Sequence, residues 1–500
     1  MLHKFITDKC SIKPMVIGIK GKWIIAHDGE KPRLLRDGVV IVEGKKITHV
    51  GKTYNGKVDK WIDAKTHVVS PGFIATHIHG ASAPKDKSFI DDVGARHFYM
   101  SSLGENLTAL GKSIKPEDFH VFAKYSMAEL LKSGCTTMVE IGMVGTLGPE
   151  TTVKYIDEMG MRAVEGCNIE DGSWTRNQKA NLYTEWLGIE HGMKLLDEAE
   201  KFVKKYDGAA DGRIIAAMYP STVDKVSAEL QKAVREKANQ LKCPVSIHAA
   251  QWVVEFQNMI RMYAKTPIEF LHETGLLGPD LIIGHGWAIA GHPLLAYPPE
   301  GEGDLKLLAE SGATVSHDPL VFVKRGNKMH SHSQYLEAGV NLGIGCDTSP
   351  QDMLNEMRMA SYTSKLADWS CFSGSAAEIH SSATLGGARA IGRKDLGRIT
   401  PGATADIAII NMETLNNVPC RDPVKALVNS ATREDVTHVM VDGKLVIENG
   451  ELLVIDEAKL VSQVQKTTQA IWDRIPENHY LGQHSDVVSP QSYEPWDPDQ

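Results

Sequence analysis

The sequence predicts a (β/α)8 barrel with a small, discontinuous β-domain that is built from both ends of the chain. Eight apolar segments in the middle of the chain are each followed by a stretch long enough for a helix, which is the pattern of a parallel barrel. Segments rich in β-branched residues and broken at glycine occur at both ends of the chain, which indicates a second, smaller sheet. A chain of 500 residues has room for both parts.

The small β-domain is predicted from two pairs of strand-like segments. MVIGIKGKWIIAHDG and DGVVIVEGKKITHVG lie near the start of the chain, and ADIAIIN and HVMVDGKLVIENG lie near its end. Asp442 and Gly443 form a two-residue hairpin signal in the last of these segments. Neither pair is large enough to close a core alone, so we expect residues 1–70 and 400–456 to fold together.

The barrel is expected at residues 71–399, and residues 457–500 are expected to form a C-terminal helix and an extended tail. Residues 116–134 and 221–241 are two of the helical stretches expected between or after strands. The segment after the first strand, residues 81–104, is long enough to cover the barrel mouth. The eight barrel strands are expected at residues 70–77, 135–141, 161–167, 213–219, 244–249, 280–285, 312–317 and 340–347.

The composition is that of an ordinary folded protein, with 42% hydrophobic residues, 23% charged residues and a net charge of −9. The acidic balance and the lack of a dense Lys/Arg tract argue against nucleic-acid and membrane partners, so we expect a small-molecule substrate. Seven scattered cysteines without a CxxC pair, and no run of 18 apolar residues, predict a cytoplasmic protein that does not span a membrane. We expect the protein to be a homo-oligomer.

The first barrel strand ends in two histidines, His77 and His79. Residues i and i+2 of an extended segment point the same way, so both imidazoles can face one point. A barrel of this type places its functional groups at the carboxyl ends of its strands. On its own, however, a His-x-His pair more often consists of surface or core residues than of metal ligands.

Three other predicted strands end the same way. The fifth ends at His248, the sixth at His285, and the eighth leads into Asp347. The alternative is that each of these buried polar groups has its own separate hydrogen-bond partner, because an unpaired buried polar group is costly. Three histidines and one aspartate form a ligand set that suits Zn²⁺, with Fe²⁺ or Co²⁺ as alternatives, and leave a position open for water.

The chain resembles the mononuclear metal branch of the amidohydrolase superfamily, which includes cytosine and guanine deaminases, triazine hydrolases and phenylurea hydrolases. The motifs that carry this resemblance are PGFIATHIH, SIHAAQ, IIGHGW, GIGCDTSPQDM and the downstream segment ATLGGARAIGRKDLGRITPGATADIAII. The resemblance implies that one divalent metal is bound by His77, His79, His248 and Asp347, and that His285 contacts the substrate or the nucleophilic water. A second metal is not expected, because the fourth strand ends without the Lys or acidic residue that binuclear members use.

One position departs from the family pattern. Deaminases of the family have Glu three residues after the fifth-strand histidine, whereas this chain has Gln251, which does not titrate. We therefore expect hydrolysis of an aryl or heterocyclic amide, urea or carbamate by metal-activated water, with Asp347 moving protons. The alternatives are an aminohydrolase that releases ammonia from a heteroaromatic ring, and, in another class, a non-catalytic metal-containing binding barrel.

Substrate contacts are expected from Gln251, His317, Trp252 and Trp287, which follow or end predicted strands. For His317, at the end of the seventh strand, pocket lining and structural hydrogen bonding are equally consistent with the sequence. The two tryptophans form either an aromatic wall for a ring-bearing substrate or ordinary packing. A second His-x-His pair, at positions 330 and 332, precedes a helix and is expected at the surface.

Overall fold

The structure, a computed structural model, describes residues 15–81, 87, 109–176, 182–295, 302–494 and 496. Eight parallel strands close into a barrel, which confirms the predicted fold class. The predicted loop over the mouth, residues 81–104, lies almost entirely outside the described residues. The barrel strands are β5 (Phe73–Ile78), β6 (Cys135–Glu140), β7 (Arg162–Asn168), β10 (Ile214–Tyr219), β11 (Val245–Ala249), β12 (Leu281–His285), β13 (Thr314–His317) and β14 (Asn341–Ile344).

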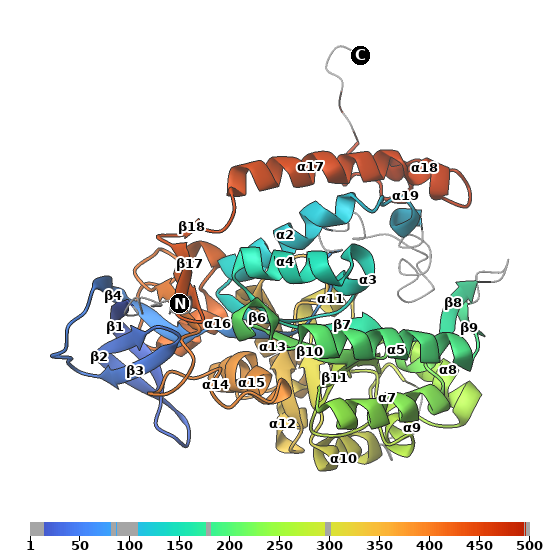
Figure 1. Cartoon of the computed structure of the whole chain (residues 1–500), viewed down its shortest axis with the longest axis horizontal. Coiled ribbons are helices and arrows are strands. Elements are labelled where there is room, and N and C mark those ends of the chain that lie inside the picture. Colours follow the sequence, from blue (N-terminus) through green and yellow to red (C-terminus); the bar gives the residue numbers. More distant parts are fainter. Residues whose placement is uncertain are drawn as a thin grey trace, which may run out of the picture.

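A separate eight-stranded sheet combines strands from the two ends of the chain, in the order β18-β17-β16-β15-β4-β1-β2-β3. Its N-terminal and C-terminal halves meet where β4 pairs antiparallel with β15, with Ser70 opposite Ala408. Figure 1 shows the blue and the red strands at the same end of the molecule. The strands are β1 (Val16–His27), β2 (Pro32–Glu43), β3 (Lys46–Gly51), β4 (Lys60–Pro71), β15 (Ile407–Asn411), β16 (Val436–Val441), β17 (Lys444–Glu448) and β18 (Glu451–Leu452).

The chain passes from this sheet into the barrel at Gly72, between β4 and β5. A Cβ atom at Gly72 would lie 2.3 Å from the side chain of Thr136 on β6, so the close approach requires glycine. The Gly72 N–H donates to the carbonyl of Asp406, which ties the crossing point to the start of β15. The exact limits of the two domains stay predictions.

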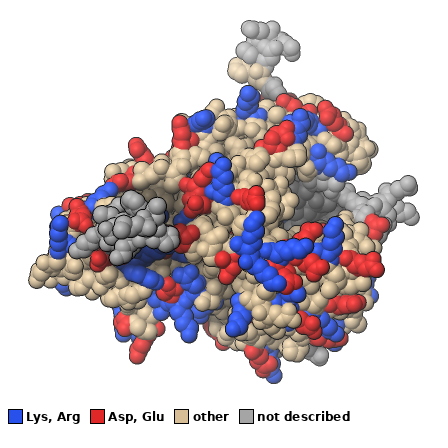
Figure 2. Space-filling view, in the orientation of Figure 1, with Lys and Arg blue, Asp and Glu red and all other residues tan. Residues whose placement is uncertain are grey.

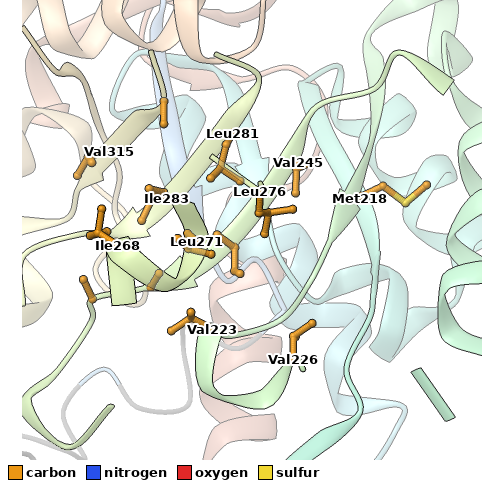
Figure 3. Packing of buried hydrophobic residues seen from close by; sticks show 14 of the residues in the cluster. Met218, Val223, Val226, Val245, Ile268, Leu271, Leu276, Leu281, Ile283 and Val315 are labelled. Atoms are coloured by element: carbon orange, nitrogen blue, oxygen red, sulfur yellow. The ribbon is translucent and has the colours of Figure 1, made fainter. Parts of the chain in front are cut away.

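Helices cover the outside of the barrel (Figure 1). The start of α9 illustrates how the sequence determines where a helix begins. Thr266 and Glu269 form a capping box, and Pro267 occupies the first helical position. Figure 3 shows strand side chains such as Val245 and Ile283 packed against helix residues such as Leu271. The helices referred to below are α2 (Asp118–Lys132), α3 (Met143–Leu147), α8 (Val253–Tyr263), α9 (Pro267–Glu273), α11 (Pro319–Val323), α12 (His332–Glu337), α13 (Met353–Asp368), α14 (Ala376–Ser381) and α17 (Glu457–Asp473).

The C-terminal segment begins with the predicted helix, α17, which packs across α2 (Figure 1). The segment after it is not simply extended as predicted, because it contains the short helices α18 (Ile475–Asn478) and α19 (Ser485–Val488). Ile475 is fully buried in a cluster with Leu110, Phe122 and Ile471. The burial of Ile475, with Val488 packed against the same cluster, helps to hold the start of the tail against the body of the protein.

The described surface carries charges of both signs. In the view of Figure 2, acidic and basic side chains are interspersed over the face of the molecule, an arrangement typical of a solvated surface. Among the described residues, no helix is both long enough and apolar enough to cross a membrane.

Candidate metal centre

The carboxyl ends of the barrel strands bring together the five side chains that the sequence singles out. His77 is the last but one residue of β5, and His79 follows directly after this strand. His248 lies on β11, and His285 ends β12. The ring of His77 lies 5.2 Å from that of His79, 4.8 Å from that of His248 and 4.6 Å from that of His285, measured between centroids. Asp347 follows β14, and its Oδ1 atom lies 3.4 Å from His79 Nε2.

Two of the histidines turn the same nitrogen toward each other. The Nε2 atoms of His79 and His248 lie 3.1 Å apart. His79 Nδ1 donates to the carbonyl of Ile141 at 3.0 Å, and His248 Nδ1 donates to the carbonyl of Ser221 at 2.8 Å. A carbonyl oxygen only accepts, so each Nδ1 carries the proton and each Nε2 carries a lone pair. Two facing lone pairs are the arrangement that a bound cation requires.

His77 supplies a third nitrogen. Its ring is fully buried, and neither of its nitrogens has a hydrogen-bond partner among the described residues. A buried nitrogen without a partner is costly unless a ligand satisfies it. Asp347 Oδ1 lies 3.7 Å from His77 Nε2, so a carboxylate oxygen completes the set. Three imidazole nitrogens and one carboxylate fit a divalent metal such as Zn²⁺.

The backbone around Asp347 holds this residue against the first strand. The N–H groups of Cys346 and Asp347 both donate to the carbonyl of His77, and the N–H of His79 donates to the carbonyl of Asp347. Asp347 itself adopts φ 51°, a left-handed conformation that is unfavourable for a residue with a side chain. The hydrogen bonds to β5 therefore hold a strained turn that presents the carboxylate to the histidines.

The protonation states of His79, His248 and Asp347 suit metal binding. At His77, by contrast, burial lowers the pKa but nearby Asp318 and Asp347 raise it overall. Burial lowers the pKa of His79 to about 4 and the pKa of His248 well below its ordinary value. Both rings are therefore neutral at pH 7, as ligands must be. Burial opposes ionisation of Asp347, but the neighbouring rings of His77 and His285 hold its pKa well below the usual range. Asp347 is accordingly a carboxylate.

His285 has a partner that the sequence reasoning did not identify. Its Nδ1 atom lies 2.9 Å from Oδ2 of Asp318, and both side chains are almost fully buried. The other oxygen of Asp318 accepts from the hydroxyl of Ser316 at 2.9 Å, and Ser316 contacts the hydroxyl of Thr76 at 2.7 Å. The only sequence signal for Asp318 is its position directly after the end of a predicted strand.

His317 is not brought into the histidine cluster. Ser316 contacts Thr76 inside the barrel, and the next side chain on a strand points to the opposite face. His317 Nδ1 lies 3.0 Å from His332 Nδ1, and His332 Nε2 lies 2.9 Å from the hydroxyl of Ser382. This geometry fits the structural hydrogen bonding that the sequence left open for His317.

The expected surface position of the second His-x-His pair is wrong for His332. His330 is half-buried, whereas His332 is completely buried. The reason is that α12 begins at His332 and packs on β14, which places the ring between His317 and Ser382. The residues around this pair are polar, so the sequence does not indicate that His332 is buried.

Trp252 and Trp287 are buried, and each contacts another aromatic ring. Trp252 lies 5.7 Å from Trp174, and Trp287 lies 5.6 Å from Phe322, between ring centroids. Phe322 also lies edge-on to His285 at 5.1 Å, so Trp287 is one ring removed from the histidine cluster. Whether either tryptophan contacts substrate stays a prediction.

Gln251 follows β11 and is half-buried. The nearest acidic residue along the chain is Glu255 on α8, which is fully buried and accepts from the Ala250 N–H at 2.6 Å. Burial raises the pKa of Glu255 well above its ordinary value. Glu255 is occupied by the backbone of Ala250 and lies on α8, so it does not take the place of the Glu missing at position 251.

Two further buried carboxyl groups lie beside the metal centre. Glu140 on β6 accepts from the N–H groups of Gly80 and Met143, at 2.9 and 2.8 Å. Burial raises the pKa of Glu140 to about 7, and burial together with Glu140 raises the pKa of Glu165 on β7 well above its ordinary value. In the sequence, each is the single acidic residue of its strand. This isolated acidic residue is the signal that could have identified them.

Comparison with known proteins relates the chain to a set of deaminases. A 5'-deoxyadenosine deaminase from Methanosarcina barkeri is 27% identical over 91% of this chain and 98% of its own length. A 5-methylthioadenosine/S-adenosylhomocysteine deaminase from Thermococcus onnurineus is 30% identical over 88% of this chain and 95% of its own length.

Solved structures show the same fold. An adenosine deaminase from Xanthomonas campestris with bound zinc has a TM-score of 0.78 at 23% identity, over 92% of this chain and 99% of the other. An atrazine chlorohydrolase from Arthrobacter aurescens complexed with zinc has a TM-score of 0.75 at 21% identity, over 90% of this chain and 100% of the other. The model of the amidohydrolase family matches residues 68–446. The chain belongs to the amidohydrolase family.

Proposed function

We propose that this enzyme uses one divalent metal, Zn²⁺ in the first instance, to hydrolyse a carbon–nitrogen bond in a ring-bearing small molecule. As a member of the family, the chain is a hydrolase of carbon–nitrogen bonds other than peptide bonds. The observation that carries the proposal is the convergence of His77, His79, His248 and Asp347 at one point, with His285 packed beside them.

The metal would be held by His77, His79, His248 and Asp347. Fe²⁺ and Co²⁺ accept the same donors and are the alternatives to Zn²⁺. When bound, the metal supplies Lewis acidity, which polarises the substrate and lowers the pKa of a water molecule. The zinc in two structurally similar proteins supports this choice.

The proton transfers and the orientation of the substrate are assigned to residues of the chain. The reaction adds water across the bond, so a proton must leave the attacking water and the departing nitrogen must gain one. We assign the proton transfers to Asp347 and His285, which are the groups at the cluster that can carry them. Gln251 is expected to orient the substrate by hydrogen bonding, because a carboxamide donates and accepts without titrating.

Two substrate classes follow from two different observations. Gln251 favours an aryl or heterocyclic amide, urea or carbamate, whose hydrolysis needs no carboxylate at position 251. The similarity to nucleoside deaminases favours the second candidate, an aminohydrolase that releases ammonia from a heteroaromatic ring. We place the amide, urea or carbamate class first, because residue 251 belongs to the site itself.

The products distinguish these classes. Zinc-loaded protein is incubated with adenosine-type nucleosides in one panel and with phenylureas, N-aryl carbamates and aryl amides in another. Ammonia is quantified by an enzyme-coupled assay and organic amines by mass spectrometry. Organic amine without ammonia supports the first class, and ammonia from a ring amine supports the second. A lack of turnover in both panels would point to the non-catalytic binding barrel.

We also propose that the protein is cytoplasmic and forms a homo-oligomer. The free cysteines among the described residues are consistent with a reducing compartment. Trp369 and Phe372, near the end of α13, are 93% and 85% exposed, and exposed aromatic residues of this size are typical of protein interfaces. Sedimentation of the native protein and of a Trp369→Ser, Phe372→Ser variant tests the assembly, which the double variant should weaken.

A further inference from the structure

We infer that Asp318 is a positioning residue for the reaction, which acts by fixing the orientation and the tautomer of His285. This inference rests on the proposed function, because it concerns the same site. The geometric basis is the 2.9 Å ion-pair contact between His285 Nδ1 and Asp318 Oδ2, which lacks the angles of a hydrogen bond, in a place where both side chains are almost completely shielded from solvent.

The environment of Asp318 shows that its carboxylate is reserved for this contact. Asp318 occupies the N-cap position of α11, where aspartate ordinarily accepts from the backbone of the following turn, yet its side chain makes no capping hydrogen bond. Its Oδ1 atom instead accepts from Ser316, which leaves Oδ2 for His285. The side chain is therefore turned away from its own helix and toward the histidine cluster.

The packing around Asp318 leaves room for the carboxylate. A Cβ atom at Gly345, before the turn that carries Asp347, would lie 2.0 Å from Asp318 Oδ1 and 2.6 Å from Ser316 Oγ. Only glycine at this position allows Asp318 to sit against the end of β14. An incidental ion pair would not require glycine at position 345.

The backbone of His285 also supports a functional geometry. His285 adopts φ 81°, and Gly286 after it adopts φ 53°, so two successive left-handed residues turn the chain sharply at the end of β12. For a residue with a side chain this conformation is strained. The turn places the His285 ring 4.6 Å from His77 and edge-on to Phe322.

The consequence of the contact follows from the chemistry of imidazole. The negative charge of a carboxylate oxygen 2.9 Å from Nδ1 favours electrostatically the tautomer with its hydrogen on Nδ1, which leaves the lone pair on Nε2. His285 then presents a hydrogen-bond acceptor in a defined direction. This matters here because Gln251 stands where relatives of the deaminase type are expected to carry a titrating residue.

The test is Asp318→Asn, which preserves the size of the side chain but replaces the carboxylate with an amide. We expect kcat to fall by about 10²- to 10³-fold and KM to change less than about threefold. The zinc content should equal that of native protein. This pattern is the one expected when a group that orients a catalytic residue is lost. Asp318→Glu, which restores the charge, should recover part of kcat.

A second readout is independent of activity. In zinc-loaded protein labelled with ¹⁵N-histidine, the His285 signal, assigned by its loss in His285→Asn, should show hydrogen on Nδ1, and Asp318→Asn should shift that signal. The matched control is Asp435→Asn, which changes a buried aspartate that caps Thr432 far from the barrel mouth. This control should leave kcat and the His285 signal unchanged.

Three results would overturn the inference. Native kcat in Asp318→Asn would show that the contact is only structural. Loss of zinc from this variant would show instead that Asp318 ligates metal, as its proximity to His77 and His285 allows. A native His285 signal with hydrogen on Nε2 would contradict the tautomer. Because the ¹⁵N signal needs no substrate, it tests the inference even if the proposed reaction is wrong.

Discussion

Nε2 of His79 and Nε2 of His248 lie 3.1 Å apart, although 169 residues separate them in the sequence. The two rings are almost parallel, with an interplanar angle of 8°. In each ring the Nδ1–H group donates to a backbone carbonyl, that of Ile141 for His79 and that of Ser221 for His248. The backbone of the barrel thus determines the tautomer of both rings, and it leaves two lone pairs directed at the position where a cation is expected.

The first prediction concerns His285. Replacing His285 with Asn should lower kcat/KM by about 10²- to 10⁴-fold, because a positioned polar group beside the reacting atoms is lost. The zinc content should stay at the native level, since His285 is outside the proposed ligand set. Kinetics and elemental analysis of the same preparation check both parts. A variant without metal would show that His285 is a ligand instead.

The second prediction separates the two substrate classes through Gln251. If Gln251 only orients the substrate, Gln251→Ala should raise KM more than it lowers kcat. Gln251→Glu should impair hydrolysis of an amide or urea, because a carboxylate near the metal competes for coordination or raises the pKa of the water. Steady-state kinetics on the native substrate, with amine and ammonia both quantified, provide the measurement. Faster release of ammonia from a ring amine by Gln251→Glu would favour the deaminase instead.

The third prediction concerns the stability of the junction between the barrel and the outer sheet. Arg162 of β7 is buried and contacts Asp406 at 3.2 Å and Asp442 at 3.3 Å. Arg162→Met removes the cation and leaves the buried carboxylate of Asp406 without an ion pair among the described residues, whereas Asp442 keeps Lys45 at 2.8 Å. The variant should destabilise the fold by about 3–5 kcal/mol. Urea denaturation measures the effect.

The control for Arg162 is Arg33→Ala, which removes an exposed ion pair with Asp28. Exposed pairs contribute at most about 1 kcal/mol, so this variant should unfold close to the native midpoint. Equal effects of the two substitutions would show that burial of the Arg162 cluster does not determine its contribution.

The fourth prediction is a pH dependence of stability. His380 of α14 is buried and contacts the hydroxyl of Ser70 at 3.0 Å, and burial lowers its pKa from 6.5 to about 4. Below pH 6.5 the unfolded chain takes up a proton at this residue, while the folded protein does so only near pH 4. His380 therefore destabilises the fold progressively as the pH falls through this window, by up to about 3 kcal/mol.

His380→Gln keeps a hydrogen-bonding group beside Ser70 but removes the titration. The free energy of unfolding of this variant should fall less steeply between pH 6.5 and pH 4 than that of the native protein. His484→Gln, at an exposed position, should follow the native curve. Identical slopes for His380→Gln and native protein would contradict the prediction.

The barrel and its outer sheet could be predicted because their signals are local. Each barrel strand is an apolar run of a few residues, with His285 as the last residue of β12 and His248 as the last but one of β11. The resemblance then predicted which of these residues belong to the metal site, and the structure places them together. Neither signal depends on contacts between distant parts of the chain.

The partners of the site residues could not be predicted, because distant parts of the chain define them. Asp318 precedes Pro319 and looks like an ordinary helix cap, and nothing nearby indicates His285, which lies on another strand. His332 lies in a polar segment, and only the packing of α12 on β14 buries it. Glu165 differs from Asp318 and His332, because it is an acidic residue within an apolar strand. This signal is local and can be recognised in the sequence.

The most direct test of the account is a zinc titration of metal-free protein, with product release recorded from the best substrate of the carbon–nitrogen panels. The account predicts no turnover after chelation and a linear rise that levels off at one equivalent of Zn²⁺ per chain, with Co²⁺ or Fe²⁺ also restoring activity. His79→Ala should show no such break, because it removes one of the proposed ligands. Full activity before any metal is added, or a rise that continues to two equivalents, would contradict the proposed single site.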